Sequence, residues 1–288
     1  GYDLVISCES GPAKGVITHP AALHVCYCHT PMRYLWDQYH FYRANAGWIT
    51  RWLIRRMDAI IATSDISASY LKRAATVVTH GVDTEIYAPP ADRAAAFAES
   101  GLPGKYAIGC FGRVRAQKGS DVFVAAMCRL LPRYPDFSAV LVGAITPEQM
   151  PFAGELRKQI ADAGLAQRIV ITGELDIADV QRWYQRLTIY AFTSRNEGFG
   201  LTLIEAMAVG AALVAARAGA AEIVVEDGVT GALVPPGDVD ALVTALEPLM
   251  QDPAAALAMG ARARTRVVEK FSLEAEADKI AAVYRGLV

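Results

Sequence analysis

Short apolar runs alternate with amphipathic stretches along most of the chain, and this alternation predicts a parallel α/β sheet. From residue 105 onward, apolar runs predict strands at residues 106–111, 138–142, 168–172, 188–193 and 212–215. Helical patterns separate and follow them at residues 120–131, 152–163, 177–186, 201–209, 238–251, 253–270 and 273–287. Strands that alternate with helices in this way form βαβ units. We therefore expect a doubly wound domain with a helical tail.

The first ninety residues carry the same pattern in a shorter form. Strands are expected at residues 3–7, 23–27, 59–63 and 76–79, with helices near residues 48–57 and 66–72. A proline pair at residues 89–90 predicts a domain boundary, because proline stiffens a connection and cannot continue a ladder. We therefore predict two Rossmann-like lobes, residues 1–90 and 91–288. The first opens directly on a strand pattern without an initiator methionine, so we expect it to be truncated.

Composition narrows the class of protein. The chain has 288 residues, of which 53% are hydrophobic and 20% charged, which is enough apolar material for a sizeable core and excludes a disordered chain. The longest apolar run, residues 206–216, is shorter than the ~18 residues that a membrane-spanning helix needs. A net charge of −2 gives no overall footprint for nucleic acid. Five cysteines in apolar stretches are typical of a reducing compartment, so we expect a cytoplasmic protein.

The densest group of chemically capable residues is the segment from Ser194 to Glu205, at a predicted strand-to-helix junction. Ligands bind at this edge of a parallel sheet. Gly198 and Gly200 let the backbone approach a ligand, and the first N–H groups of the following helix, at Leu201 and Thr202, favour an anion. The two carboxylates of this segment would accept hydrogen bonds from a hydroxyl-rich ligand such as a sugar.

A second strand-to-helix junction, residues 110–119, carries two cations between glycines. Arg113 offers a planar fork and Lys118 a point charge, which is the combination expected around a diphosphate. Either junction alone is also compatible with an ordinary turn whose charges are solvated. Two of them in one predicted sheet are much harder to explain as ordinary turns.

These motifs together resemble the donor site of retaining GT-B glycosyltransferases of family 4. The resemblance rests on Gly112-Arg113, Lys118-Gly119, and Glu197 and Glu205 with seven residues between them, and it extends to residues 81–83 and 229–238. Within that family, the second half of the chain is most similar to bacterial mannosyltransferases of lipopolysaccharide core assembly, which use GDP-mannose. The resemblance implies two Rossmann-like lobes that face a cleft. Residues 1–45 are similar to a different branch of the family, which leaves the acceptor open.

The resemblance also implies a role for each matched residue. Arg113 and Lys118 would neutralise the diphosphate as it leaves, and Glu205 would hold the nucleotide ribose. Glu197 would bind hydroxyls of the transferred sugar, and His29 would face that sugar from the N-terminal lobe. The expected donor-binding set is Gly112, Arg113, Lys118, Glu197, Gly198, Phe199, Gly200, Leu201, Thr202 and Glu205. Fixed cations at the leaving diphosphate would lower the barrier, so we expect no metal and no cofactor besides the donor substrate.

Two patterns could suggest a metal site. Asp238-Val239-Asp240 has the spacing of metal-dependent glycosyltransferases, but it follows a Pro-Pro-Gly turn and opens a helical pattern, so Asp238 is expected to be an N-cap. Cys26 and Cys28 lie beside His29, yet a C-x-C pair lacks the spacing of common zinc sites. Neither pattern changes the expectation of a metal-independent enzyme.

Two aromatic stretches in the first lobe bear on the acceptor. The segment from Trp48 to Met57, if helical, is a short basic amphipath with two tryptophans of the interfacial type. It favours either a peripheral contact with the cytoplasmic membrane face or, somewhat more strongly, a helix that buries its tryptophans on the sheet. The run from Tyr34 to Tyr42 suits either an acceptor wall or core packing.

The sequence thus favours a retaining transferase that moves a hexose, mannose from GDP-mannose, onto a lipid-linked saccharide such as a lipopolysaccharide core. One alternative is a nucleotide-sugar epimerase of the same architecture, and another is a nucleotide-sugar-binding module without turnover. A nicotinamide-dependent dehydrogenase is disfavoured, because neither glycine motif continues as G-x-G-x-x-G.

Overall fold

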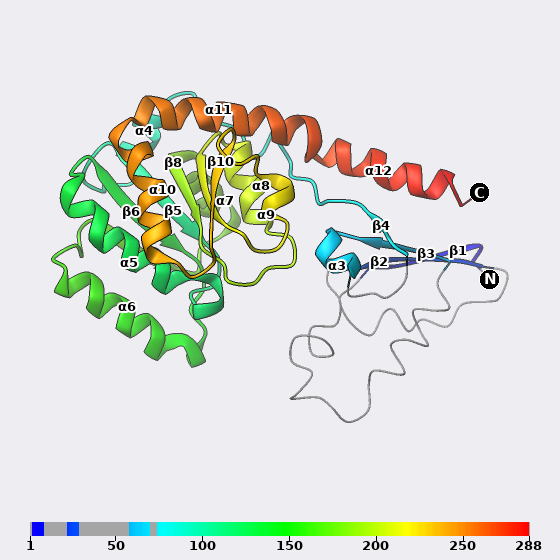
Figure 1. Ribbon diagram of the computed structural model, residues 1–288, viewed down its shortest axis with the longest axis horizontal. Coiled ribbons are helices and arrows are strands. Elements are labelled where there is room, and N and C mark those ends of the chain that lie inside the picture. The colour runs from blue at the N-terminus through cyan, green and yellow to red at the C-terminus, as the bar shows by residue number, and fades with distance from the viewer. Residues whose placement is uncertain (1, 9–21, 29–57, 70–73, 288) are drawn as a thin grey trace. The chain divides into compact units, whose positions relative to one another are not determined.

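The computed structural model describes residues 2–8, 22–28, 58–69 and 74–287 and divides the chain into two compact units (Figure 1). The larger unit is Gly81–Leu273, and the smaller combines Gly1–His80 with Glu274–Val288. This division differs from the boundary expected at residue 90. The residues after His80 belong to the larger unit because Val82 N–H donates to the Phe271 carbonyl at 2.9 Å and Leu273 N–H to the Val82 carbonyl at 3.2 Å.

The larger unit is built on one six-stranded sheet in which every neighbouring pair is parallel. Its strands are β5 (Tyr106–Phe111), β6 (Phe137–Val142), β7 (Ile169–Gly173), β8 (Leu187–Phe192), β9 (Ala212–Ala216) and β10 (Gly231–Val234). Their order in the sheet is β10-β9-β8-β5-β6-β7. All residues of β6, β8 and β9 are buried, which explains their continuous apolar sequences.

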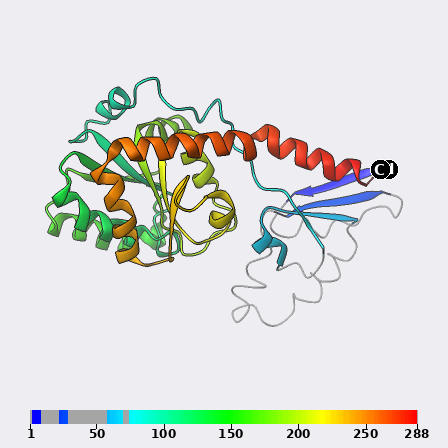
Figure 2. The ribbon, with the colours of Figure 1, turned by 45° about the horizontal axis from the view of Figure 1, so that its top comes forward.

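Helices enclose this sheet on both faces (Figures 1 and 2). The α-helices of the unit are α4 (Arg93–Ala98), α5 (Ser120–Leu130), α6 (Met150–Asp162), α7 (Ile177–Arg186), α8 (Leu201–Ala208), α9 (Ala221–Val224), α10 (Val239–Gln251) and α11 (Pro253–Lys270). Three short 3₁₀ turns join them: η2 (Ala116–Lys118), η3 (Leu131–Arg133) and η4 (Pro147–Gln149). The core has two layers: α5, α6 and α10 pack on one face of the sheet, and α7, α8 and α9 on the other.

Aspartate caps begin several of these helices. The Asp238 carboxylate accepts from the Ala241 N–H at 2.9 Å, so its expected role as an N-cap is confirmed. Asp92, Asp176 and Asp252 cap α4, α7 and α11 in the same way. Each cap satisfies one or, for Asp92, two of the N–H groups that a helix start leaves without an internal partner.

The predicted elements agree closely with the larger unit. The bounds of β5, α7 and α11 are those expected, and the other predicted strands and helices there differ by one or two residues at an end. Besides the 3₁₀ turns, two α-helices and one strand were missed, namely α4, α9 and β10. Each has only four or six residues, too few for a hydrophobic period to stand out.

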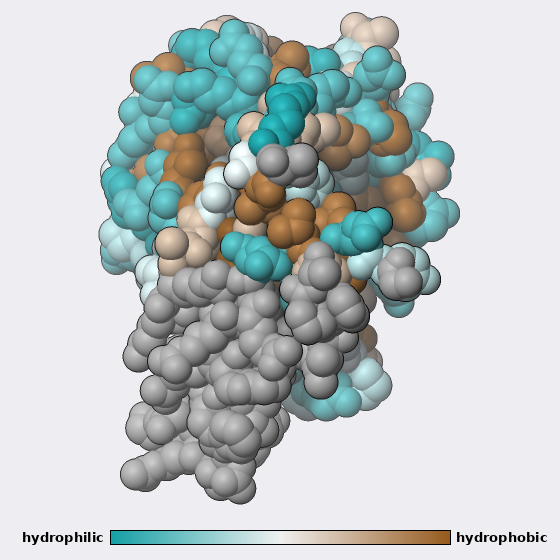
Figure 3. Space-filling view, turned by 90° about the vertical axis from the view of Figure 1, so that its right-hand side faces the viewer, coloured by the Kyte–Doolittle hydropathy of each residue, from teal (hydrophilic) through white to brown (hydrophobic). Residues whose placement is uncertain are grey.

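The smaller unit contains a parallel sheet of order β1-β2-β3-β4 among its described residues. Its elements are β1 (Leu4–Cys8), β2 (Leu23–Cys28), β3 (Ala59–Ala62), α3 (Asp65–Ser69), β4 (Thr76–Val77) and α12, which begins at the unit boundary (Leu273–Arg285). Helix α12 packs on this sheet through Ile280 and Val283, and the Tyr27 hydroxyl donates to Glu276 at 2.5 Å. Hydrophobic residues reach the surface in the space-filling view of Figure 3. Leu4 and Ile6 of β1 are among the exposed hydrophobic residues of the smaller unit.

Two further sequence expectations concern membranes and cysteines. Within the described ranges, no helix combines the length and apolar character needed to cross a bilayer. Cys26 and Cys110 are buried in apolar clusters, and burial raises the pKa of the Cys110 thiol to about 11. A thiol in that state packs as a small hydrophobic side chain.

Candidate functional site

The two predicted loops follow neighbouring strands at the centre of the larger sheet. The chain runs outward from β5 to β6 and β7, then returns to the other side of β5 to form β8, β9 and β10. The strand order therefore reverses between β5 and β8. In doubly wound sheets this switch point opens a crevice at the carboxyl ends of the strands, where ligands bind. The loop after β5 holds Arg113 and Lys118, and the loop after β8 holds Glu197.

Glycines allow these two loops to touch. Gly119 has a φ of 67°, and a Cβ at this position would lie 2.0 Å from the Thr193 carbonyl oxygen. Gly219, in the loop after β9, has a φ of 60°, and its Cβ would lie 2.9 Å from the Glu197 Cβ. Both positions combine a left-handed backbone with close contact, so only glycine fits. Gly219 was not singled out in the sequence, although it lies three residues after the end of β9.

Lys118 and Glu197 form an ion pair across the two loops. The Lys118 Nζ contacts Glu197 Oε2, and the Ser194 hydroxyl donates to the same oxygen at 3.3 Å. The two charged side chains are 20% and 19% exposed. A cation and a carboxylate that were 79 residues apart in the sequence therefore meet at the switch point, partly shielded from water.

Arg113 differs from Lys118 in its surroundings. The residue is exposed, and among the described residues it has no ion-pair partner closer than 4.0 Å. Gly112, just before it, has a φ of 138°, which places the chain in a conformation that favours glycine. Arg113 therefore offers a second positive charge in the same loop as Lys118.

The start of helix α8 has the geometry expected for an anion site. Gly200 forms the N-cap with a φ of 101°, Leu201 is 48% exposed and Thr202 is half-buried. The first N–H groups of a helix have no partner within it and carry its positive dipole end. The Phe199 side chain is buried in the core, and its carbonyl accepts from the Ala220 N–H at 3.1 Å. Phe199 thus supports the loop from beneath.

Glu205 lies in a different environment from Glu197. It is largely buried, the Tyr184 hydroxyl donates to its Oε2 at 2.6 Å, and the Tyr87 hydroxyl also donates to it. Burial raises the pKa of this carboxyl above its usual 4.5, although both tyrosines favour the ionised form. Neither tyrosine was singled out in the sequence. A carboxylate that is buried on an apolar helix needs hydrogen-bond donors. The position of Glu205 in an apolar helix was therefore the sequence feature that indicated a nearby donor such as a tyrosine hydroxyl.

Motif residues outside the two loops have mainly structural contacts. A Cβ at Gly81 would lie 2.4 Å from the Ser272 carbonyl oxygen, and Asp83 accepts from the N–H groups of Glu85 and Ile86 at 3.0 and 2.9 Å. Within the described ranges, no group of three or more His, Cys, Asp and Glu side chains is arranged to hold a metal ion. His29 and the stretches 34–42 and 48–57 lie outside the described residues.

Comparisons with known proteins agree with this geometry. Residues 105–252 match the family described as glycosyl transferases group 1. The chain is 48% identical over 239 residues to the lipopolysaccharide core biosynthesis mannosyltransferase LpcC of Rhizobium leguminosarum bv. viciae, covering 83% of this chain and 67% of that protein. It is 31% identical over 214 residues to a GDP-mannose-dependent alpha-(1-6)-phosphatidylinositol monomannoside mannosyltransferase of Mycolicibacterium smegmatis, covering 72% of this chain and 55% of that protein.

A solved structure supports the fold over a longer stretch. The crystal structure of Anabaena Alr3699/HepE in complex with UDP and glucose superposes with a TM-score of 0.80 at 26% identity, covering 92% of this chain and 72% of that one. The profile match covers the sheet that carries the Lys118–Glu197 pair, and the structural match extends to both units. The chain therefore belongs to the glycosyl transferase group 1 family and has the α/β architecture of GT-B glycosyltransferases.

Proposed function

We propose that this protein transfers mannose from GDP-mannose, with retention of anomeric configuration, onto a lipid-linked saccharide such as a lipopolysaccharide core. The observation that supports this proposal most is the Lys118–Glu197 pair at the β5/β8 switch point. The exposed Arg113 lies in the same loop as Lys118. The substrate class is supported by the names of the two mannosyltransferases to which the chain is similar, one of them GDP-mannose-dependent.

The chemistry of the proposed donor site follows from its charges. When the glycosidic bond breaks, its electron pair moves to the diphosphate and positive character develops at the anomeric carbon. Lys118 and Arg113 neutralise the leaving diphosphate, and fixed cations in a partly shielded site stabilise that charge without reorganisation. The phosphate is proposed to engage Lys118 in place of Glu197, so that Glu197 is then free to accept hydrogen bonds from sugar hydroxyls.

Glu205 is proposed to bind the ribose of the nucleotide. An ionised carboxylate has about four acceptor positions, and Tyr184 and Tyr87 occupy two of them. The remaining positions suit a pair of vicinal hydroxyls. The tyrosines hold the carboxylate in place, which reduces the ordering cost when the nucleotide binds.

The acceptor side is proposed from the sequence. The family resemblance assigns His29 to the donor sugar, and the segment from Trp48 to Met57 is the candidate for a peripheral contact with the cytoplasmic face of the membrane, where a lipid-linked acceptor would be held. Two cations at the diphosphate take the place of a metal ion, so the reaction is proposed to need none.

Ligand-induced stabilisation is the first test. GDP, UDP and ADP are each added at the same concentration, about 100 times the dissociation constant of GDP, where a ligand that binds only the folded protein adds ~2.7 kcal/mol of stability. We expect GDP to raise the melting temperature most. A larger shift with UDP or ADP would contradict the proposed donor.

Transfer itself is tested with radiolabelled GDP-mannose and detergent-solubilised lipopolysaccharide cores that lack mannose. We expect labelled product in EDTA as well as in magnesium, with an α-linkage by NMR of the anomeric proton. Formation of an epimerised nucleotide sugar without acceptor would favour the epimerase instead. Nucleotide binding without either product would favour a binding module.

A further inference from the structure

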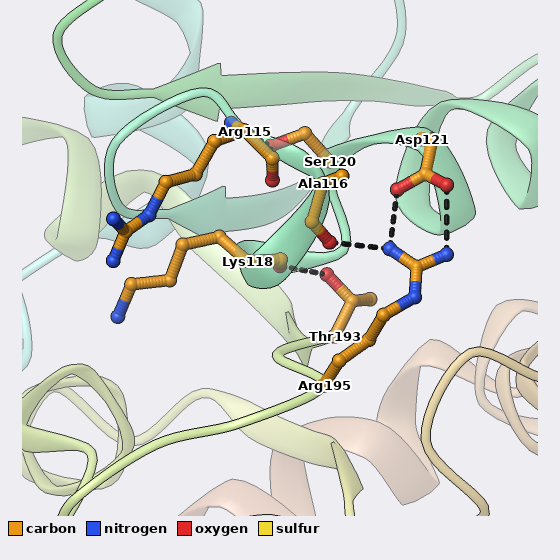
Figure 4. Close-up of polar contacts among 7 residues, drawn as sticks. All are labelled: Arg115, Ala116, Lys118, Ser120, Asp121, Thr193 and Arg195. Atoms are coloured by element: carbon orange, nitrogen blue, oxygen red, sulfur yellow. Dashed lines mark hydrogen bonds and ion pairs between the residues drawn. The ribbon is translucent and has the colours of Figure 1, made fainter. Parts of the chain in front are cut away.

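Arg195 joins the two loops of the site without belonging to the donor-binding set. Its Nη1 and Nη2 donate to Oδ1 and Oδ2 of Asp121, each at 2.7 Å, in a bidentate pair (Figure 4). Nη1 also donates to the carbonyl of Ala116. Asp121 lies in the first turn of α5 and Arg195 in the loop after β8, so one guanidinium connects two elements that are 74 residues apart.

The segment 193–195 forms hydrogen bonds with all three residues of η2, the turn that ends in Lys118. The Arg195 side chain donates to the Ala116 carbonyl, and the Arg195 backbone N–H donates to the Gln117 carbonyl at 2.9 Å. The Thr193 hydroxyl donates to the Lys118 carbonyl at 3.0 Å. Lys118 is thus fixed by its backbone to the loop that supplies its partner. Glu197 follows Arg195 by two residues, so both members of the ion pair are anchored at this crossing.

The Arg195–Asp121 pair differs in geometry from an ordinary surface ion pair. Such pairs contribute little unless they are bidentate or form part of a network, and this one is both. Burial alone would raise the pKa of Asp121, yet the hydrogen bond and charge of Arg195 outweigh it and lower that pKa below its usual range. The lowered pKa is consistent with the bidentate pair seen in the structure.

We propose that Arg195 and Asp121 are positioning residues that hold Lys118 at Glu197, so that the pair meets the donor diphosphate already in place. Lys118 and Arg115 extend away from Arg195 in Figure 4, and the nitrogens of Arg195 are directed at Asp121 and Ala116. Arg195 therefore acts through Lys118 and does not itself touch the donor. This inference rests on the proposed function, because it assigns the pair a part in that reaction.

Steady-state kinetics of mannose transfer test the inference with R195Q, R195K and D121N. A misplaced catalytic group raises the transition-state barrier more than it weakens ground-state binding, so we expect kcat of R195Q and D121N to fall by about 10- to 100-fold while KM for the donor changes by less than about threefold. R195K should be nearly as slow as R195Q, because lysine cannot form the bidentate pair and reach the carbonyl as well. The double variant R195Q/D121N should be no slower than either single variant, because the two residues act as one unit.

Arg133 supplies the matched control. It bridges η3 to Glu247 of α10, residues 114 apart in the chain, and its side chain is 50% exposed against 37% for Arg195. R133Q should keep kcat within about twofold of wild type. A merely structural role for Arg195 would lower the melting temperature of R195Q and leave kcat per folded molecule unchanged, and that result would overturn the inference.

Hydrogen–deuterium exchange separates this inference from the proposed function. In R195Q, the amides of residues 116–119 should exchange at least about tenfold faster than in wild type, and in R133Q they should not, because exchange reports local opening. If wild type transfers no mannose, the proposed function fails, while faster exchange in R195Q still supports the restraint on Lys118. Unchanged exchange in R195Q would overturn the inference whatever the transfer assay gives.

Discussion

Glu197 and Glu205 lie eight positions apart on one loop and helix, yet the structure gives them opposite surroundings. Glu197 is partly exposed and pairs with the charged Lys118. Glu205 is largely buried and is held by the neutral hydroxyls of Tyr184 and Tyr87. A charged partner at the surface can be exchanged for a phosphate, whereas neutral donors in the interior hold one geometry. The two carboxylates of a single motif therefore have different kinds of partner, and we propose that Glu197 takes part in the reaction and Glu205 in nucleotide binding.

The largest effect is expected from the charged region. K118A and E197A should each lower kcat of mannose transfer by about 10²- to 10³-fold, because one member of a preorganised electrostatic site is removed. Circular dichroism should show an intact fold. K158A, which removes an exposed lysine paired with Asp162 on α6, is the control and should leave transfer unchanged. Near wild-type turnover of K118A or E197A would show that the site is wrongly assigned.

The buried region should affect nucleotide binding more than turnover. E205A removes an acceptor of ribose hydroxyls, and hydrogen bonds to a charged group contribute about 1.5–3 kcal/mol, so affinity for GDP should fall by about 10- to 100-fold. Isothermal titration calorimetry measures this directly. If E205A bound GDP as tightly as wild type, Glu205 would have no part in holding the nucleotide.

A single tyrosine hydroxyl tests what holds Glu205. Y184F removes one donor from a buried carboxylate and should lower the free energy of unfolding by about 1–2 kcal/mol in urea denaturation. Y134F is the matched control, since the Tyr134 hydroxyl donates to Glu247 at 2.8 Å where the Glu247 side chain is 27% exposed. Y134F should lower the free energy of unfolding by less than Y184F does, because water can replace the missing hydroxyl at the more exposed Glu247. Equal losses in the two variants would argue against the contrast between the regions.

The smallest effect is a pH dependence of stability. The pKa of Glu205 is raised in the folded protein, so the folded state holds this proton more firmly than the unfolded state. The resulting stabilisation is complete below the usual pKa of 4.5 and is lost as pH rises through the raised value. E205Q does not ionise, so its stability relative to wild type should increase from pH 4 to pH 7. A difference that is constant over this range would contradict burial of the charge.

Local features of the fold were largely predictable from the sequence. Strand β5 and helices α7 and α11 have the expected bounds because their ends carry clear signals: Gly112 follows β5, and Asp176 and Asp252 precede the helices. Helix α4 was missed because its six residues are too few for a period. The domain boundary was expected at the proline pair, residues 89–90. Backbone hydrogen bonds between Val82 and residues 271–273 instead place residues 81–90 in the larger unit.

The sequence by itself determined the residue types of the site, the strand-to-helix junctions that carry them and the parallel α/β class, since these depend on local periodicity and on glycine. Only the tertiary structure decided that β5 and β8 are neighbours, that Lys118 meets Glu197, that two tyrosines hold Glu205 and that Arg195 reaches Asp121. The physical reason is distance along the chain. Residues 74 or 79 positions apart are brought together by the packing of a whole sheet, which no local pattern specifies.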